Sequence, residues 1–385
     1  MVLLLQNTVL IATLFYVFAT LAQNRAHKAW LLGCFVLFSG WDIIGQAIAE
    51  GLGFVGRSTA FPAHLENWNI GLQYSSHVTQ IFWVPNHAIA GWACVAGYLY
   101  WRAGRIPAGP FAVIVGLCAM WSPLAVLGAV PFVARAGFRD LAFRRLTLRS
   151  LAALALATAG LAPVLAYLVT DSQVVARGFA RIDSLTVTRY TLFVVLEVFP
   201  FLVLLCALSL KGTLGRSEVA IVAASLLLIP FYDIGTVDFV MRASIPALAV
   251  LALLVGANSW PGAGGARAVP LAIATAFLAI GAVTPVYEIG RALVTPAFAV
   301  SRCDIIESVR QSPFAAIPTY STIPTYLART DEAARTGSLL ALTGHAPAAR
   351  SPERCWPDRG GDWVLYYGSS GPTPHDGRIS QGETQ

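Results

Sequence analysis

The sequence predicts an all-α fold, specifically a polytopic transmembrane helical bundle, and three observations support this. The 385-residue chain is 56% hydrophobic and only 12% charged, whereas a soluble domain carries about 25% charged residues. Apolar segments of about 18 or more residues recur along it, which is close to the length a helix needs to cross a bilayer. Basic residues also gather in alternate connections between these segments, as the positive-inside rule describes for cytoplasmic loops.

Taken in order, the apolar segments predict about eight spans. They cover residues 2–22, 29–49, 79–101, 150–170, 189–210, 218–236, 240–257 and 269–290. The basic connections predict that residues 135–150 and 211–217 are cytoplasmic, and that 51–78 and everything after the last span lie outside. The predicted organisation is therefore a bundle over 1–290, an extracytoplasmic tail over 291–368 and a disordered end over 369–385. The expected location is a bacterial inner membrane, with the lipid bilayer as the main partner.

One apolar segment, residues 109–134, does not alternate with the others, because the connections on both of its sides are basic. Pro123 near its centre prevents a continuous straight helix, and each half is too short to span. The sequence therefore predicts a re-entrant hairpin that enters and leaves on the cytoplasmic side. The alternative is a kinked full span, which would invert the topology of everything downstream.

Charge and motifs exclude several other classes of protein. The net charge is +6, but the basic residues are dispersed among short loops rather than gathered on one face, so we expect no nucleic-acid partner. The chain has no Walker loop, no GxGxxG turn and no Cys-x-x-Cys pair, and we predict neither a metal nor a cofactor. In the outer tail, Cys303 and Cys355 form a candidate disulfide, because that compartment is oxidising.

Polar groups gather at the predicted outer face in places where hydrocarbon should reject them. They are Asp42 near the outer end of the second span, the trio Asp233, Asp238 and Arg242 between the sixth and seventh spans, and a polar loop at 64–87. Glu197 lies inside the fifth span. Ionisable groups in spans usually face a bundle interior or a water-filled cavity, because exposure to lipid is costly. The chemistry-bearing residues of the loop are His64, Glu66, Gln73, Tyr74, His77, Asn86 and His87.

Each of these groups also has a purely structural interpretation. Asp238 is a candidate helix N-cap, and Arg242, one turn later, is placed for a helical ion pair with it. His64 and His77 are alternatively solvated loop residues, since a lone histidine is weak evidence for a metal. Three tryptophans are expected to be interfacial anchors rather than a sugar platform: Trp68, Trp83 and Trp92.

Two short motifs and the order of the segments resemble the GT-C superfamily, the polytopic glycosyltransferases that use polyprenyl-phosphate sugars. The segment WSPLAVLGAVPF, residues 121–132, is similar to the family's hairpin with a central Ser-Pro or Lys-Pro. MRASIPALAVL, residues 241–251, is similar to the family's span headed by R-x-x-x-P-x-L, with Arg242 and Pro246 at the matching positions. The resemblance covers residues 1 to 290 and implies transfer of a sugar to an acceptor at the outer face.

The resemblance implies that Arg242 contacts the phosphate of a polyprenyl-linked sugar, with Asp238 or Asp233 orienting it. Asp42, His64 and Glu66 are then the catalytic candidates. The remaining predicted substrate-binding residues are Gln73, Tyr74, His77, Asn86 and His87. The family's acidic pair in its first outer loop has no counterpart before Asp331 and Glu332, so we expect the family's first span and loop to be missing. The alternatives are a transporter or flippase, with Glu197 and Asp42 as intramembrane relay groups, and a non-catalytic membrane subunit.

Overall fold

The structure of the chain is a computed structural model. It describes residues 2–53, 64–69, 71–143, 147–169, 178–179, 184–208, 210, 213–233, 238–260 and 268–294. The described residues are almost entirely helical, which confirms the all-α class. Within them, two short strands pair in antiparallel fashion: β1 (Gly178–Phe179) and β2 (Tyr232–Asp233), with Asp233 opposite Gly178. The predicted tail from residue 295 onward, including Cys303 and Cys355, lies outside the described residues, as does the predicted disordered end.

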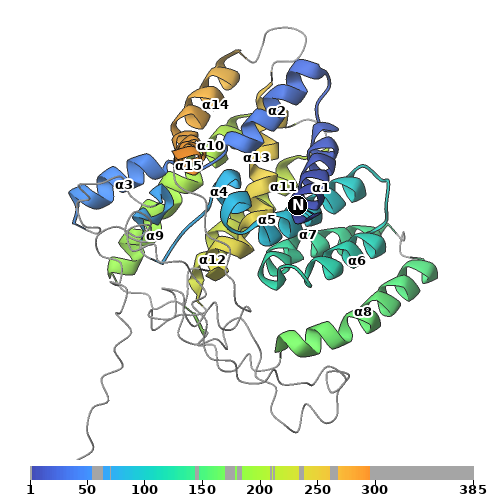
Figure 1. Ribbon diagram of the computed structural model, residues 1–385. Helices are drawn as coiled ribbons and strands as arrows, with labels where there is room; N and C mark the ends of the chain where they lie inside the picture. Colours follow the sequence, from blue (N-terminus) through green and yellow to red (C-terminus); the bar gives the residue numbers. More distant parts are fainter. Residues whose placement is uncertain are drawn as a thin grey trace, which may run out of the picture. The chain divides into compact units, whose positions relative to one another are not determined.

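The chain divides into two units. Apart from residues 166–169 and 294, the helices below belong to the first unit, which comprises residues 1–57, 64–165 and 177–293. The second unit comprises residues 58–63, 166–176 and 294–385. The α-helices, labelled in Figure 1, are α1 (Val2–Ala19), α2 (Arg25–Leu37), α3 (Asp42–Gly51), α4 (His77–Trp83), α5 (Pro85–Arg102), α6 (Ala108–Cys118), α7 (Pro123–Ala142), α8 (Leu148–Val169), α9 (Ser184–Glu197), α10 (Phe199–Ala207), α11 (Arg216–Leu228), α12 (Asp238–Ala243), α13 (Ile245–Ser259), α14 (Ala268–Gly281) and α15 (Val283–Val294). Two short 3₁₀ helices are also described, η1 (Leu65–Trp68) and η3 (Ile229–Phe231).

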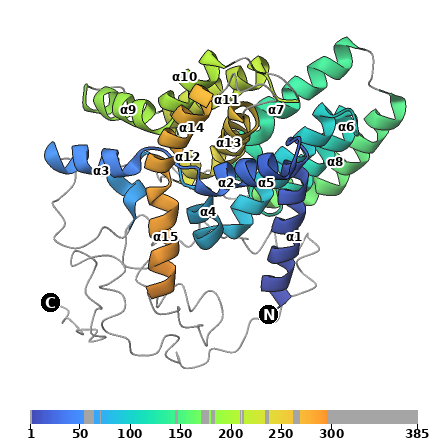
Figure 2. The same ribbon diagram turned by 90° about the horizontal axis from the view of Figure 1, so that it is seen from above.

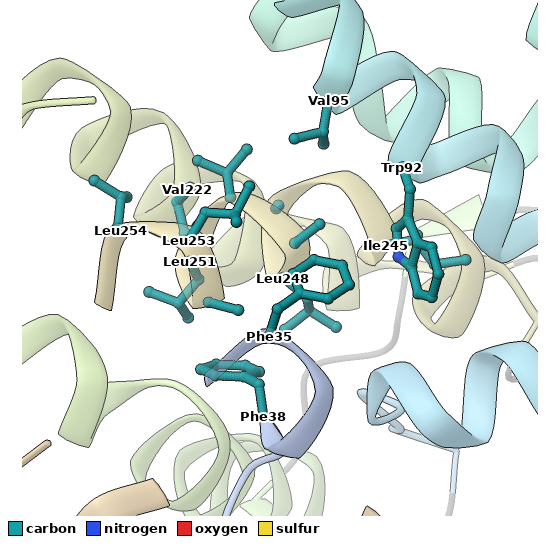
Figure 3. Close-up of a cluster of buried hydrophobic side chains, with 14 of the residues drawn as sticks. Phe35, Phe38, Trp92, Val95, Val222, Ile245, Leu248, Leu251, Leu253 and Leu254 are labelled. Carbon is teal, nitrogen blue, oxygen red and sulfur yellow. The ribbon is translucent and has the colours of Figure 1, made fainter. Parts of the chain in front are cut away.

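Helix α13 forms the centre of the core. Nearly all of its side chains are buried, as expected of a helix that is apolar on every face. It packs against α2, α5 and α11, and Figure 3 shows Phe35 beside Leu248 and Trp92 beside Ile245. Two glycines permit close approach to α13: a Cβ at Gly91 would lie 2.4 Å from a methyl of Ile245, and one at Gly256 would lie 3.0 Å from the Cα of Leu31.

Helices α6 and α7 form a helical hairpin packed on α5, and α7, with 20 residues, runs past the predicted end at residue 134. That this hairpin re-enters a membrane stays a prediction. The chain turns at residues 119–122, and Pro123 is the first residue of α7, where proline is well tolerated because no helical hydrogen bond is lost. The Ser122 hydroxyl caps α7 by accepting a hydrogen bond from the amide of Ala125. At the other end, Asp140 Oδ2 accepts a hydrogen bond from the amide of Ala108 at 2.7 Å. The two ends of the hairpin therefore lie together.

The number of spans stays a prediction. By length and composition, the described residues contain one segment able to cross a membrane, Arg25–Gly51, or as many as three if two bent helix pairs each count as one span. The pairs are Thr186–Glu197 with Phe199–Ala207, bent by 48°, and Ala268–Gly281 with Val283–Val294, bent by 40°; Figure 2 labels the second pair as α14 and α15. The expected sixth span also stops early, since α11 gives way to the η3 turn that contains Pro230.

Candidate functional site

Three fully buried carboxyl groups form what we call the carboxylate cluster: Asp42, Glu66 and Glu197. Each is only 1% exposed to solvent. They come from three separate parts of the chain, because Asp42 begins α3, Glu66 lies in η1 and Glu197 ends α9. Electrostatic interactions link all three, since Asp42 and Glu66 both act on Glu197. The fold thus gathers three acids in a region from which water is excluded.

Asp42 and Glu197 face each other directly. Asp42 Oδ2 accepts hydrogen bonds from the Ser39 hydroxyl at 2.7 Å and the Thr284 hydroxyl at 2.8 Å. Glu197 Oε1 accepts one from Trp68 Nε1 at 3.0 Å, whereas no donor among the described residues faces its Oε2. Two ionised carboxylates in contact repel each other strongly when buried, and one proton held between them removes that repulsion.

Glu66 accepts three hydrogen bonds within its own loop. Its Oε1 accepts from the amide of Ser76 at 2.8 Å and the hydroxyl of Thr79 at 2.7 Å, and its Oε2 accepts from Gln73 Nε2 at 2.9 Å. Burial, reinforced by the negative charge of Asp42, raises the pKa of Glu66 to about 8, although these three donors favour the ionised form. At neutral pH Glu66 is therefore expected to hold a proton.

No cation neutralises the carboxylate cluster within the described part of the chain. The ion pairs found there involve other acids, namely Glu218, Glu288 and Asp238. The same residues contain no group of three or more His, Cys, Asp or Glu side chains able to hold a metal ion. The arrangement suits the binding and release of protons rather than a structural ion pair.

Arg242 lies in a different group of residues. Its guanidinium pairs with Asp238 at 2.8 Å, one helical turn away, so the predicted helical ion pair is confirmed. It also acts electrostatically on His87, whose Nδ1 lies 2.7 Å from the Ser122 hydroxyl at the tip of the hairpin. The sequence predicts Arg242, His64 and Glu66 at the same face, but the described partners of His64 and Glu66 do not include Arg242.

His64 belongs to a third group, centred on Glu288, whose side chain is 1% exposed. His64 Nδ1 lies 3.2 Å from Glu288 Oε1, and Trp83 Nε1 donates to Glu288 Oε2 at 3.2 Å. Arg291 pairs with the same carboxylate and lies 4.9 Å over the Trp83 ring. His64 is therefore held by an acid from α15 and is not a freely solvated loop residue.

The other predicted site residues are placed as follows. Tyr74 is buried and its hydroxyl donates to the carbonyl of Leu226, which removes it from contact with a substrate. His77 is also buried, stacked on Phe35 with its Nδ1 2.6 Å from the Phe35 carbonyl, so the solvated-loop interpretation of His77 is wrong. Asn86 is exposed. The side chain of Asp233 lies outside the described residues.

Two of the three tryptophans predicted to be interfacial membrane anchors are buried instead. Trp68 is 3% exposed and Trp92 is 2% exposed, so neither lies at a membrane surface, and Trp68 is instead part of the carboxylate cluster. Trp83 is half-buried in the Glu288 group. The indole N–H of Trp68 donates to Glu197, whereas the N–H of Trp92 is buried with no partner among the described residues, so Trp92 is held by ring packing alone.

Sequence reasoning missed several partners of these acids. Ser39 and Thr284 are unremarkable hydroxyls within apolar segments, and no spacing distinguishes them. Glu288 and Arg291 are signalled only by their i, i+3 spacing at the end of the last apolar segment. Glu218 was also missed, although it lies near the start of an apolar segment just after Arg216.

Comparison of the chain with protein-family models, with curated proteins and with solved structures finds no match in any of the three.

Proposed function

We propose that the protein is a polytopic membrane protein that couples its activity to protonation of the carboxylate cluster, as a proton-linked transporter or flippase. One observation carries this proposal: Asp42 and Glu197 are in contact, fully buried and without an ion-pair partner among the described residues. Buried acids within membrane helices typically mark proton relays and substrate pathways. The contact unites the two residues that the sequence singled out as intramembrane relay groups.

The neighbourhood of the pair supports reversible protonation. Every described hydrogen-bond partner of the pair is a neutral donor, from Ser39, Thr284 or Trp68, so no fixed positive charge locks the acids in the ionised state. Glu197 also ends α9 immediately before the 48° bend into α10. Broken helices at the level of a buried charge are a recurrent feature of transporter sites.

Infrared difference spectroscopy on the purified protein tests the shared proton. At neutral pH Glu66 is expected to give a protonated-carboxyl band of its own. Wild type should show a further band from the shared proton, and this band should be lost or displaced in Glu197→Gln and in Asp42→Asn. Glu50→Gln is the matched control, because Glu50 lies in the same helix as Asp42 and, among the described residues, its side chain accepts a hydrogen bond from Gln46 within α3 rather than from the carboxylate cluster. A spectrum unchanged in both cluster variants would refute the shared proton.

Transport is tested in proteoliposomes that enclose a pH dye under an imposed pH gradient. The vesicles are challenged in turn with sugars, amino acids, organic cations and a polyprenyl phosphate. Wild type should dissipate the gradient only when its substrate is supplied, and Glu197→Gln should abolish that response while Glu50→Gln retains it. A response that survives Glu197→Gln would contradict coupling through the cluster.

The second candidate function is GT-C-type sugar transfer, supported by the position of Arg242. The arginine lies beside His87 and the tip of the hairpin, and its side chain is 14% exposed, so part of the guanidinium remains accessible. Arginine suits bidentate contact with a phosphate. The acids and His64 that the resemblance implies as catalytic groups lie in the other two groups, which makes this the weaker proposal.

Binding of polyprenyl phosphate to wild type, Arg242→Ala and Arg242→Lys tests this second candidate. A phosphate contact predicts a loss on the order of 2 to 5 kcal/mol of binding in Arg242→Ala and poor rescue by lysine, because an ammonium cannot reproduce the planar fork. If the side chain acts only in the largely buried helical pair with Asp238, Arg242→Ala should lower the stability of the protein and still bind lipid normally.

A further inference from the structure

A cluster of arginines lies where α5 and the hairpin end together. Arg102 Nε and Arg135 Nη2 each lie 3.0 Å from the same oxygen of Glu218, Oε1. Arg102, Arg135 and Arg139 each place a guanidinium 5.9 Å from the ring of Trp101. We call Trp101 and these three arginines the arginine cluster.

The two acids next to the arginine cluster, Glu218 and Asp140, each accept hydrogen bonds on both carboxylate oxygens. Glu218 Oε1 also accepts from the Tyr98 hydroxyl at 2.8 Å, and Glu218 Oε2 accepts from the amide of Gly215 at 2.8 Å. Asp140 Oδ1 accepts a hydrogen bond from Trp101 Nε1 at 3.1 Å, and Asp140 Oδ2 accepts one from the amide of Ala108. Among the described residues, the ion pairs of these three arginines therefore involve one carboxylate, Glu218, which pairs with Arg102 and Arg135.

Some N–H groups of these arginines therefore have no acceptor among the described residues. The Nε atom of Arg135 is buried with no hydrogen-bond partner among the described residues, and Arg139 forms no ion pair within them. Stacking on the Trp101 ring holds the Arg139 guanidinium in place and leaves its N–H edges without an ion pair among the described residues. An anion with several acceptor oxygens would satisfy these edges, and the planar fork of arginine matches a phosphate.

Exposed apolar side chains flank the same turn of α7. Phe138 is 72% exposed, Leu141 is 62% exposed and Phe143 is 62% exposed, while Arg139 lies among them and stacks on the Phe143 ring at 5.8 Å. A phosphate-binding group beside exposed apolar side chains suits an amphiphile, because the head group and the acyl chains each meet a matching surface. A free phosphate ion would contact the arginines but would have no use for the exposed apolar side chains.

We propose that the arginine cluster binds the phosphate of an anionic phospholipid at the cytoplasmic surface of the membrane. This rests on the part of the proposed function that embeds the chain in a membrane and is independent of transport. The lipid would hold the ends of α5, α7 and α11 together, since Arg102, Arg135 and Glu218 come from these three helices. Basic pockets between helices on the cytoplasmic side are a general mode of anionic-lipid recognition.

The test measures lipid binding to the delipidated, detergent-purified full chain by native mass spectrometry. Phosphatidylglycerol and phosphatidylcholine with identical acyl chains are titrated against wild type, Arg139→Gln, Arg139→Lys and Arg25→Gln. Arg139 is the residue to change because Glu218 keeps both of its arginines when Arg139 is lost. Arg25 is exposed at the start of α2, so Arg25→Gln removes one positive charge without touching the arginine cluster.

Wild type should prefer phosphatidylglycerol, and Arg139→Gln should weaken that binding at least about tenfold, as expected for loss of a charge-assisted contact. Arg139→Lys should recover only part of the affinity, and Arg25→Gln should bind as wild type does. Equal binding of both lipids, or equal losses in Arg139→Gln and Arg25→Gln, would overturn the proposal. Displacement of phosphatidylglycerol by millimolar inorganic phosphate would reassign the cluster to a free phosphate. Melting temperatures of all variants confirm that each protein is folded.

Discussion

Replacing Glu66 by glutamine should change how the stability of the protein depends on pH. Glu66 is buried beside Asp42, and its pKa is raised to about 8 from an ordinary value of 4.5. Glutamine has nearly the same shape, and it keeps an oxygen that can accept from Ser76 and Thr79. The substitution removes the titration while leaving most of the hydrogen-bonded loop in place.

The direction follows from which state holds the proton. Below pH 4.5 both the folded and the unfolded chain carry a protonated Glu66, and the stabilisation from the higher folded-state pKa is fully present. Between pH 4.5 and about 8 only the folded chain holds the proton, so stability falls as pH rises, by about 1.4 kcal/mol per pH unit. The loss across that window is on the order of 5 kcal/mol, a large part of a typical total stability.

The assay is thermal unfolding of the detergent-purified protein between pH 5 and pH 9. Wild type should lose a few degrees of melting temperature per pH unit, and Glu66→Gln should show a clearly shallower dependence on pH. Glu50→Gln should retain the wild-type slope, since Glu50 is outside the carboxylate cluster. Identical slopes for wild type and Glu66→Gln would refute the inference that Glu66 takes up a proton on folding.

The hairpin is the part of the fold that the sequence predicted most directly. Basic connections on both sides predict that the chain returns to the side from which it came, which stays a prediction, and Pro123 predicts a break between the two halves. The structure places Pro123 at the start of α7 and joins the two ends of the hairpin through Asp140 and Ala108. The basic connections and Pro123 lie within or next to the hairpin in the sequence, so the turn between its two halves could be predicted without knowledge of distant residues.

The role of α13 could not be predicted in the same way. A helix that is apolar on every face is equally consistent with a lipid-facing span and with a helix enclosed by other helices. Which of the two applies depends on neighbours distant in sequence, such as Gly91 and Leu31. The expected seventh span thus turns out to be the enclosed helix of the core.

The candidate site was predictable in its acids but not in their partners. Asp42 and Glu197 stand out because carboxyl groups are rare within apolar segments. Ser39 and Thr284 do not, because hydroxyls in apolar helices usually bond to their own backbone, as Thr8 and Thr275 do here. The pairing of Asp42 with Glu197 is a long-range contact for which the sequence offers no spacing rule.

Three further predictions test the topology, the cluster and the hairpin. Single cysteines at Asn67 and Ala103, in a background without native cysteines, should be labelled from opposite sides of the membrane, and labelling from one side would contradict the predicted topology. Trp68→Phe should lower stability by about 1 to 3 kcal/mol, because Glu197 Oε1 loses its donor, whereas Trp121→Phe at a 43% exposed site should have little effect on the melting temperature. The two glycines of α7 should respond with opposite signs to alanine. A Cβ at Gly128 would lie 1.8 Å from the carbonyl oxygen of Ala243, whereas one at Gly137 would meet nothing within 4 Å. Gly128→Ala must therefore push α7 away from α12, at a cost of about 1 to 3 kcal/mol or more, and Gly137→Ala should stabilise the helix by up to about 1 kcal/mol. Equal melting temperatures for Gly128→Ala and wild type would show that α7 and α12 are not packed as closely as this fold requires.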